Sequence, residues 1–332
     1  MSGSTSLTEK SPGTDSWLVR AGRLAAPFIG LIVVIAVFTA LEPEAFLSVR
    51  NGRTIAIQTV IVGIGALGMC FVIVAGGIDL SIGSVIALAS VVAALVVDGG
   101  HGATAAVLAA AGTGLACGVV NGGLVTGLRV PPFVATLGML GIAHGVAKLL
   151  ADNQRIAPPP KALGWLEGFV DKTPDIGWLL VAPAVWAFFG VAILAAFILR
   201  RTAFGIHVVA IGSSESTARL CGVPVVRSKI IVYALCGLGA GVAGAVMLGR
   251  LGVGDPTTAV GLELSIIAAV VIGGASLSGG EGGILGTMIG AFMLSSLDAG
   301  CNLAGIDNSV QGIIIGGIIV AAVALDGFRR RG

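Results

Sequence analysis

An aspartate in an apolar setting is the first residue of this chain whose type suggests a chemical role. Asp79 stands in the run GGIDLSIGS, between two strongly apolar segments. A carboxylate in a hydrocarbon layer costs about 2.5–3.5 kcal/mol on insertion scales, so such an acid is expected to have a use. Asp79 either accepts backbone N–H bonds at the start of the next helix or contacts a solute.

Three further polar side chains lie in comparable surroundings. Asn121 and Thr136 belong to NGGLVTGLRVPPFVATLGML, where one helix ends at glycines and a Pro-Pro pair opens the next, and Glu263 opens the apolar part of GLELSIIAAVVIGGASLSGGEGG. Asn and Thr also make ordinary hydrogen bonds between membrane helices, so both a structural and a pathway role stay open. Together with Asp79, these residues are our candidates for the lining of a solute pathway.

The residue pattern does not point to an energy source within the chain. A P-loop requires Gly-Lys-Ser/Thr to hold phosphates, and none of the five lysines follows a glycine. Ion-driven carriers usually show acids or His in mid-span, and only Lys148, Asp298 and His144 are obvious candidates here. The five cysteines lack CxxC spacing, so we expect neither a disulfide framework nor a metal site. Energy for any transport is therefore expected from another subunit, with no cofactor held by this chain.

The composition of the chain indicates whether water or lipid surrounds the elements that position these residues. Of the 332 residues, 56% are hydrophobic and only 11% are charged, against roughly 25% charged in an ordinary soluble domain. The 53 glycines are typical of membrane helices that approach one another closely. The net charge of +2 comes with no patch suited to nucleic acid. We therefore expect an all-α integral membrane protein, a tightly packed polytopic bundle.

Hydropathy and charge predict the number of spans and their orientation. Segments of about 20 apolar residues can cross a bilayer. With the N-terminus inside, twelve Lys and Arg fall inside, six fall outside and Lys148 lies within a span, which favours N-in/C-in and an even number of spans. The ten candidate spans are 25–41, 55–75, 80–97, 103–120, 133–151, 177–199, 230–250, 262–275, 283–303 and 310–326.

The polar regions complete the expected organisation. Residues 1–24 are expected to form a disordered cytoplasmic tail, 25–327 the transmembrane domain and 328–332 a basic cytoplasmic tail. A polar island at 200–229, RRTAFGIHVVAIGSSESTARLCGVPVVRSK, interrupts the apolar pattern and has five basic side chains. It is too short and too poor in large apolar residues for a core of its own. We expect a cytoplasmic loop that contacts a partner.

On the opposite face, the chain offers one sizeable loop, 151–177. Three consecutive prolines interrupt it, and they cannot continue a helix. The loop is either a simple connector or part of a docking surface for an extracytoplasmic solute carrier, with Trp165 and Phe169 as contacts.

A short pattern occurs twice. The sequence GGxxLSxG stands at 76–83 and again at 273–280, an offset of 197 residues. Repeats are common in transporters, where broken helices from two halves line a site at the bilayer midplane. The pattern hints at an internal duplication, although eight positions rich in Gly and Ser are weak evidence for one.

Four stretches together resemble a known family. These are VIVAGGIDLSIGSVIALASVVAA, NGGLVTGLRVPPFVATLGML, TAFGIHVVAIGSSESTARLCGVPVVRSKI and GLELSIIAAVVIGGASLSGGEGGILGTMIGA. Between about Gln58 and Asp326, the chain resembles inner-membrane permeases of the ribose/xylose/arabinose class of ABC sugar importers. The resemblance implies about ten spans, a homodimeric or paired permease, a cytoplasmic ATPase that binds ATP and Mg²⁺, and a periplasmic sugar-binding protein.

By the same resemblance, the polar island corresponds to the family's cytoplasmic coupling loop, with Glu215, Ala218, Arg219 and Gly222 at its core. The family commonly has Gly-Gly-Asn before the acid, whereas this chain has Gly-Ser-Ser, and Thr217 replaces a frequent Ala. These changes are small and polar, so coupling is still expected. A short helix would place Glu215 and Arg219 one turn apart as an i,i+4 pair.

The expected function is that of a transport subunit, not an enzyme, in the bacterial inner (plasma) membrane and in contact with membrane lipid. Its substrate would be a monosaccharide such as ribose, xylose or arabinose, or a related sugar or polyol, delivered by the binding protein that sets most of the specificity. An ABC permease for a branched-chain amino acid or a nucleoside is the near alternative. An ATP-independent secondary carrier is the more distant one.

Overall fold

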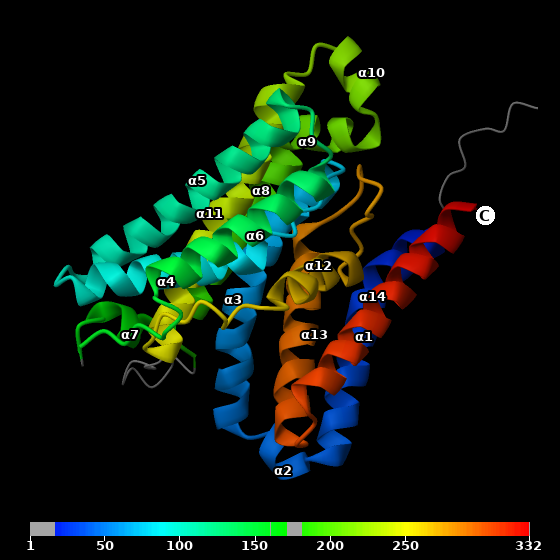
Figure 1. Cartoon of the computed structure of the whole chain (residues 1–332). Coiled ribbons are helices and arrows are strands. Elements are labelled where there is room, and N and C mark those ends of the chain that lie inside the picture. The colour runs from blue at the N-terminus through cyan, green and yellow to red at the C-terminus, as the bar shows by residue number, and fades with distance from the viewer. Residues whose placement is uncertain (1–16, 160, 171–180, 332) are drawn as a thin grey trace, which may run out of the picture.

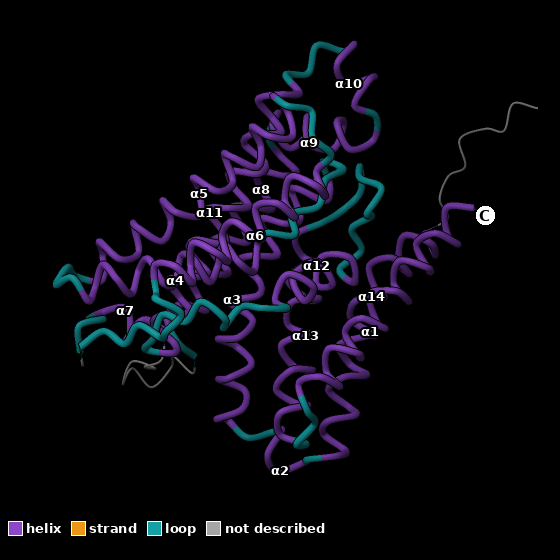
Figure 2. Tube along the Cα trace, viewed as in Figure 1, coloured by secondary structure: helices purple, strands orange, loops and turns teal. Residues whose placement is uncertain are grey.

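The computed structural model describes residues 17–159, 161–170 and 181–331, and these form an all-helical bundle (Figures 1 and 2). Strands are absent from these residues, and one isolated antiparallel bridge joins Ile156 to Gly254. The helices are α1 (Trp17–Leu41), α2 (Pro43–Phe46), α3 (Val49–Val74), α4 (Ile82–Asp98), α5 (Ala103–Gly127), α6 (Pro132–Leu150), α7 (Trp165–Val170), α8 (Pro183–Arg201), α9 (Ala203–Ser213), α10 (Glu215–Leu220), α11 (Val225–Leu251), α12 (Leu262–Ile272), α13 (Ile284–Leu303) and α14 (Asn308–Arg331).

Each of the ten apolar segments expected from the sequence coincides with one of these helices. Six helices within the described residues are long and apolar enough to cross a membrane, namely α3, α5, α6, α8, α11 and α13. Of the expected N-terminal tail, 1–16 lie outside the described residues and 17–24 belong to α1. Residues 160 and 171–177 of the expected outer loop, and Gly332 of the basic tail, also lie outside them.

The core is built around α3. Nine-tenths of its most apolar stretch is buried, and it packs against α8, α11, α12 and α13. Fully buried side chains such as Met69 and Ile73 fill its surroundings. The partly exposed helices α5, α6 and α8 present apolar side chains outward, as expected where lipid takes the place of water.

A row of glycines lets α5 and α11 come into backbone contact. Gly114, Gly118 and Gly122 recur every four residues on one face of α5. A Cβ on Gly114 would lie 2.1 Å from the carbonyl oxygen of Gly237, and one on Gly118 would lie 2.2 Å from that of Tyr233. Small residues at this spacing are how membrane helices pack closely without a hydrophobic driving force between them. The spacing fixes α11 against α5, and with it the position of Tyr233 and Lys229 on α11.

This packing predicts that Gly118→Ala destabilises the protein. The new methyl group overlaps with backbone, which cannot rotate away, and overpacking of this kind costs about 1–3 kcal/mol. We expect the purified variant in detergent to unfold at a lower temperature than the wild type, as measured by tryptophan fluorescence. The matched control is Gly123→Ala on the same helix, where a Cβ would have no atom of the described chain within 4 Å. An alanine there is neutral or stabilising, and equal unfolding temperatures for the two variants would contradict the packing argument.

The repeated GGxxLSxG pattern corresponds to repeated local geometry. α3 ends with Gly76 at φ +80°, and the N–H of Gly77 donates to the Val72 carbonyl at 2.9 Å. α12 ends in the same way, with Gly274 at φ +91°. Both ends are Schellman caps, in which glycine adopts the left-handed conformation at no steric cost. The two caps are 198 residues apart, whereas the two copies of the pattern are 197 apart. The reason is that the cap is the first glycine of the pattern in the first copy and the second glycine in the second copy. An internal duplication stays a prediction.

Candidate functional site

Asp79 lies in the break between α3 and α4 and organises the backbone there. Its Oδ1 atom accepts a 2.9 Å hydrogen bond from the backbone N–H of Ser81 and a 2.6 Å bond from the Ser81 hydroxyl. These bonds form a turn just before α4, while Ser81 itself is the N-cap residue of that helix. The carboxylate is 2% exposed. Asp79 therefore supports the helix start from two residues upstream.

Asn121 of α5 and Thr136 of α6 reach the same break. The Asn121 amide donates to the Ser81 hydroxyl at 2.9 Å and to Oδ2 of Asp79 at 3.3 Å. The Thr136 hydroxyl donates to the Pro132 carbonyl of its own helix at 2.9 Å and lies 3.2 Å from the carbonyl of Ile78. Both side chains are buried. Three helices are thus joined at the break by one buried polar network.

Glu263 is the one candidate that this network does not include. It lies in the first turn of α12, where its Oε1 accepts the backbone N–H of Gly261 at 3.2 Å. Its Oε2 faces the first turn of α4, since a Cβ on Gly83 would lie 2.2 Å from it. The side chain is half-buried, unlike the other three. The four candidates therefore surround one break, and only Glu263 borders open space. Substrate contact by any of them stays a prediction.

The polar island forms two short helices, α9 and α10, at one end of the bundle (Figure 1). Thr202 caps α9 by accepting the Gly205 N–H at 3.3 Å, and Ser214 caps α10 by accepting the Thr217 N–H at 3.3 Å. Ser and Thr at N-caps satisfy backbone donors that a helix start leaves open. The expected loop is therefore helical over most of its length, and α10 protrudes from the bundle.

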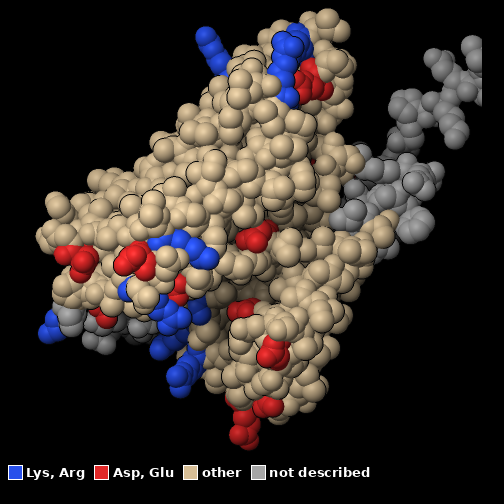
Figure 3. Space-filling view, viewed as in Figure 1, with Lys and Arg blue, Asp and Glu red and all other residues tan. Residues whose placement is uncertain are grey.

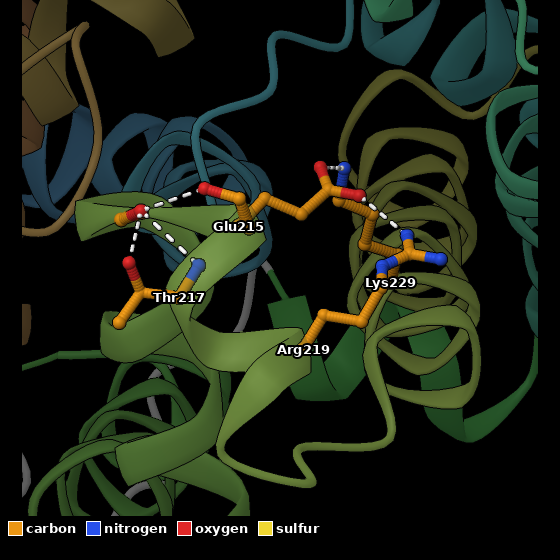
Figure 4. A network of polar contacts seen from close by, with 6 residues as sticks. Glu215, Thr217, Arg219 and Lys229 are labelled. Atoms are coloured by element: carbon orange, nitrogen blue, oxygen red, sulfur yellow. Dashed lines mark hydrogen bonds and ion pairs between the residues drawn. The ribbon is translucent and has the colours of Figure 1, made fainter.

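Glu215 forms two ion pairs, one within α10 and one that joins α10 to α11 (Figure 4). Its carboxylate lies 2.9 Å from the Arg219 guanidinium, the expected i,i+4 pair, and 2.5 Å from the Lys229 ammonium in the second turn of α11. The hydrogen bond from Lys229, then the pair with Arg219, hold the pKa of Glu215 below its ordinary value. The stabilisation is therefore present above the ordinary glutamate pKa of about 4.3 and is lost only as the pH falls through the lowered value.

The remaining expected coupling residues divide into buried and exposed ones. Ala218 is buried against Ile211 and Val225, so it holds α10 to its neighbours. Gly222 adopts φ +81° and ends α10. The outer surface of α10 is left to Arg219 and to Leu220, which is 89% exposed. Leu220 is therefore accessible on a protruding helix, and its contact with a partner stays a prediction.

Four glycines connect α9 to the bundle, and we call them the glycine junction: Gly76, Gly212, Gly279 and Gly280. A Cβ on Gly212 would lie 1.8 Å from the carbonyl oxygen of Val74 and 2.5 Å from the Gly280 nitrogen. The Gly280 N–H itself donates to the Val74 carbonyl at 2.9 Å. The end of α9, the end of α3 and the break between α12 and α13 therefore meet backbone against backbone, next to the start of α10.

Charged side chains gather toward the two ends of the molecule, with a broad uncharged area along the upper bundle between them (Figure 3). At the end opposite α10, Arg155 pairs with Asp255 at 2.7 Å. Trp165 of α7 packs edge-on against Phe169 with ring centroids 5.9 Å apart, and its indole N–H donates to the Thr104 hydroxyl at 3.2 Å. Trp165 is half-exposed, so this small aromatic pair is partly open to contact.

Comparison with known proteins identifies the family. A family model described as "Branched-chain amino acid transport system / permease component" matches residues 53–323. The ribose import permease protein RbsC of Escherichia coli (strain K12) is 39% identical over 320 residues, which cover 94% of this chain and 95% of that protein. The chain belongs to the permease family of ABC sugar importers. The permease is thus a transport component and not an enzyme.

Further relatives of the permease are named for more than one sugar. The RbsC protein of Bacillus subtilis (strain 168) is 36% identical, over 90% of the permease and 91% of that protein. The L-arabinose transport system permease protein AraH of Escherichia coli (strain K12) is 33% identical, over 91% of each chain. No solved structure matches the permease.

Some residues of the site carry no recognisable signal in the sequence. Lys229 is 14 positions from Glu215 and on a different helix, so helical spacing does not pair them. Gly212 has no side chain, and only its contacts show why it must be glycine. The sequence singles out His144 only as a residue that an ion-driven carrier could use, and it does not single out Ser84; both become candidates for solute contact because they line a cavity beside Glu263. Leu220 was not predicted from the sequence, where the one available signal was a leucine within a polar island.

Proposed function

We propose that the permease translocates a monosaccharide, a pentose such as ribose or arabinose or a related sugar, in an ATP-driven importer. The observation that carries the proposal is the protruding helix α10, in a chain whose relatives along nearly its whole length are named as ribose and arabinose import permeases. The family model names branched-chain amino acids, but these relatives favour a sugar. A periplasmic binding protein would deliver the substrate and set most of the specificity.

In this proposal, both termini and α10 face the cytoplasm and about ten helices span the inner membrane. The excess of Lys and Arg in the flanks expected to be inside supports this orientation. In Figure 1, α10 and the C-terminal end of α14 lie toward the same end of the bundle, and α2 and α7 lie toward the other. An even number of crossings agrees with that arrangement.

A cytoplasmic ATPase subunit would bind at α10 and move the bundle. Leu220 and Arg219 offer an apolar and a charged contact on its outer surface. The ion pair between Glu215 and Lys229 ties α10 to α11, and the glycine junction ties α9 to α3. Displacement of α10 by the closing ATPase would therefore be transmitted to α11 and α3. The solute pathway would open alternately to the two faces of the membrane.

A second permease copy and the binding protein complete the proposed assembly. The cavity beside Glu263 is open on one side in a single chain, so a second copy would help to enclose a passage. The outer surface around α7 and the Arg155–Asp255 pair lies on the face from which the binding protein would approach.

Reconstitution tests this function directly. The permease and its co-expressed ATPase would be reconstituted in liposomes, together with the binding protein that a neighbouring gene encodes. Uptake of radiolabelled D-ribose, L-arabinose and leucine would be measured with ATP supplied on the side of the membrane where the ATPase lies. We expect sugar uptake that requires ATP and the binding protein. Uptake that persists without ATP, or a tagged permease that never retains an ATPase, would exclude the ABC mechanism. Uptake of leucine in preference to sugars would favour the amino-acid alternative.

A further inference from the structure

A cavity of about 120 Å³ lies beside the α3–α4 break. Its walls come from α4, α6, the segment between α11 and α12, and the first turn of α12. They are formed by Ser84, Ala87, Leu140, His144, Pro256, Ala259, Val260 and Glu263. Most of the lining is apolar, and three side chains in it carry polar groups. Small-molecule sites commonly have this composition, an apolar wall with a few placed polar groups.

Glu263 and His144 are available to a ligand. Within the described residues, Glu263 forms no ion pair, and its one hydrogen bond is accepted at Oε1 from Gly261. The His144 imidazole is half-exposed and has no hydrogen-bond partner among the described residues. A carboxylate accepts hydrogen bonds through both oxygens, and a neutral imidazole both donates and accepts one. The cavity therefore offers unused donors and acceptors from two different helices.

The depth of this cavity in the bundle makes the Glu263 carboxylate energetically costly unless it hydrogen-bonds to water or to a solute. α12 has 11 residues and is too short to cross a membrane. In Figure 1 it lies between the end of the bundle that carries α10 and the end that carries α2. An acid at such a depth faces a water-filled cavity or a passing solute more often than lipid. Glycine at position 83 leaves space for it, because any side chain there would overlap with Oε2.

The wall opposite Glu263 is held rigidly by the buried network. The Ser84 hydroxyl donates to the Ser81 carbonyl at 3.0 Å, and Ser81 is bonded to Asp79 and Asn121. A first turn of α4 that is fixed from behind keeps the cavity wall in place when a solute binds. The buried residues thus position the wall, and the residues that face the cavity are the ones that can touch a solute.

We propose that this cavity is the contact point for the sugar during translocation, with Glu263 and His144 hydrogen-bonding its hydroxyl groups and Pro256, Ala259 and Val260 covering its C–H face. This inference rests on the proposed function and names its substrate-contacting residues. A carboxylate makes the stronger hydrogen bonds to hydroxyls, so Glu263 contributes most. Two polar contacts in a half-open cavity hold a sugar weakly, as release to the far side requires.

Direct binding tests this site without the other subunits. Saturation-transfer difference NMR on the detergent-purified permease would use millimolar D-ribose as the probe, with leucine as the non-sugar comparison. We expect a ribose signal from the wild type and a loss of about tenfold in apparent affinity for Glu263→Gln, the scale of a hydrogen bond to a charged group. His144→Phe should also weaken binding. Asp98→Asn at the exposed end of α4 and His101→Gln serve as matched controls and should bind ribose as the wild type does.

The outcomes separate this site from the function itself. Glu263→Gln and His144→Phe that bind ribose like the wild type would overturn the site, whatever the uptake assay shows. A wild type that binds no ribose at these concentrations would overturn it as well. Failure of ATP-dependent uptake in reconstituted wild type, with ribose binding retained, would instead contradict the proposed function and leave the cavity as a sugar site. Circular dichroism and elution volume would establish that each variant is folded.

Discussion

Glu215→Arg is expected to abolish the proposed sugar uptake, with less than about a tenth of wild-type activity remaining, while the protein still inserts into the membrane. The substitution places a third positive charge beside Arg219 and Lys229, where the wild type has two ion pairs. Lys229 is mostly shielded from water, its side chain being 17% exposed, so its unpaired charge is costly. α10 is then repelled from α11 and loses its fixed position. The measurements are ATP-dependent uptake in liposomes and the amount of folded protein in membranes.

Two further variants show which pair carries the effect. Arg219→Gln removes the partner that is 61% exposed and should leave the amount of folded protein and its unfolding temperature in detergent nearly unchanged, because exposed pairs contribute about 0.2–1 kcal/mol. The double variant Glu215→Lys with Lys229→Glu restores opposite charges between α10 and α11 and should recover much of the uptake. No recovery in the double variant, or normal uptake in Glu215→Arg, would contradict the coupling role of this pair.

Gly212→Val is expected to have an equally large effect through the glycine junction. A Cβ at this position would lie 1.8 Å from the Val74 carbonyl oxygen and 2.5 Å from the Gly280 nitrogen. Both are backbone atoms, so the overlap is relieved only by moving α9 away from α3, and we expect a cost beyond the usual range of about 1–3 kcal/mol for overpacking. Uptake should be lost, and the unfolding temperature in detergent should fall.

The matched control for the junction is Gly283→Ala, at the end of the same glycine-rich break. A Cβ there would make only an ordinary contact, 3.6 Å from an Arg200 nitrogen, and its backbone is extended. Uptake and unfolding temperature should stay close to those of the wild type. Equal behaviour of the two variants would show that the close approach at Gly212 is not needed for coupling.

The apolar segments and their helices were predictable from the sequence. All ten expected segments coincide with helices, because a bilayer requires every spanning backbone group to be satisfied within its own helix. The i,i+4 pair of Glu215 and Arg219 was also predictable and is confirmed, since both residues belong to one short helix. So was the acceptance of a backbone N–H by Asp79, which depends on residues only two positions apart.

Contacts between distant segments were beyond the sequence. Lys229 pairs with Glu215 only because the chain turns back at Gly222. The network of Asp79 with Asn121 joins residues 42 positions apart, and nothing local specifies it. The division between buried candidates and the half-buried Glu263 depends on how α4, α6 and α12 pack together. A residue type shows what chemistry is available, whereas packing decides which side chains a solute can reach.

The glycine junction also bears on how such transporters diversify. At this contact, the main chain of α9 meets the main chain of α3 and of the break after α12, so side-chain identity has little influence on it. The residues that face the cavity beside Glu263 are on other parts of α4, α6 and α12. If the cavity holds the solute as proposed, substitutions there change the solute contact and leave the backbone contact of the glycine junction as it is.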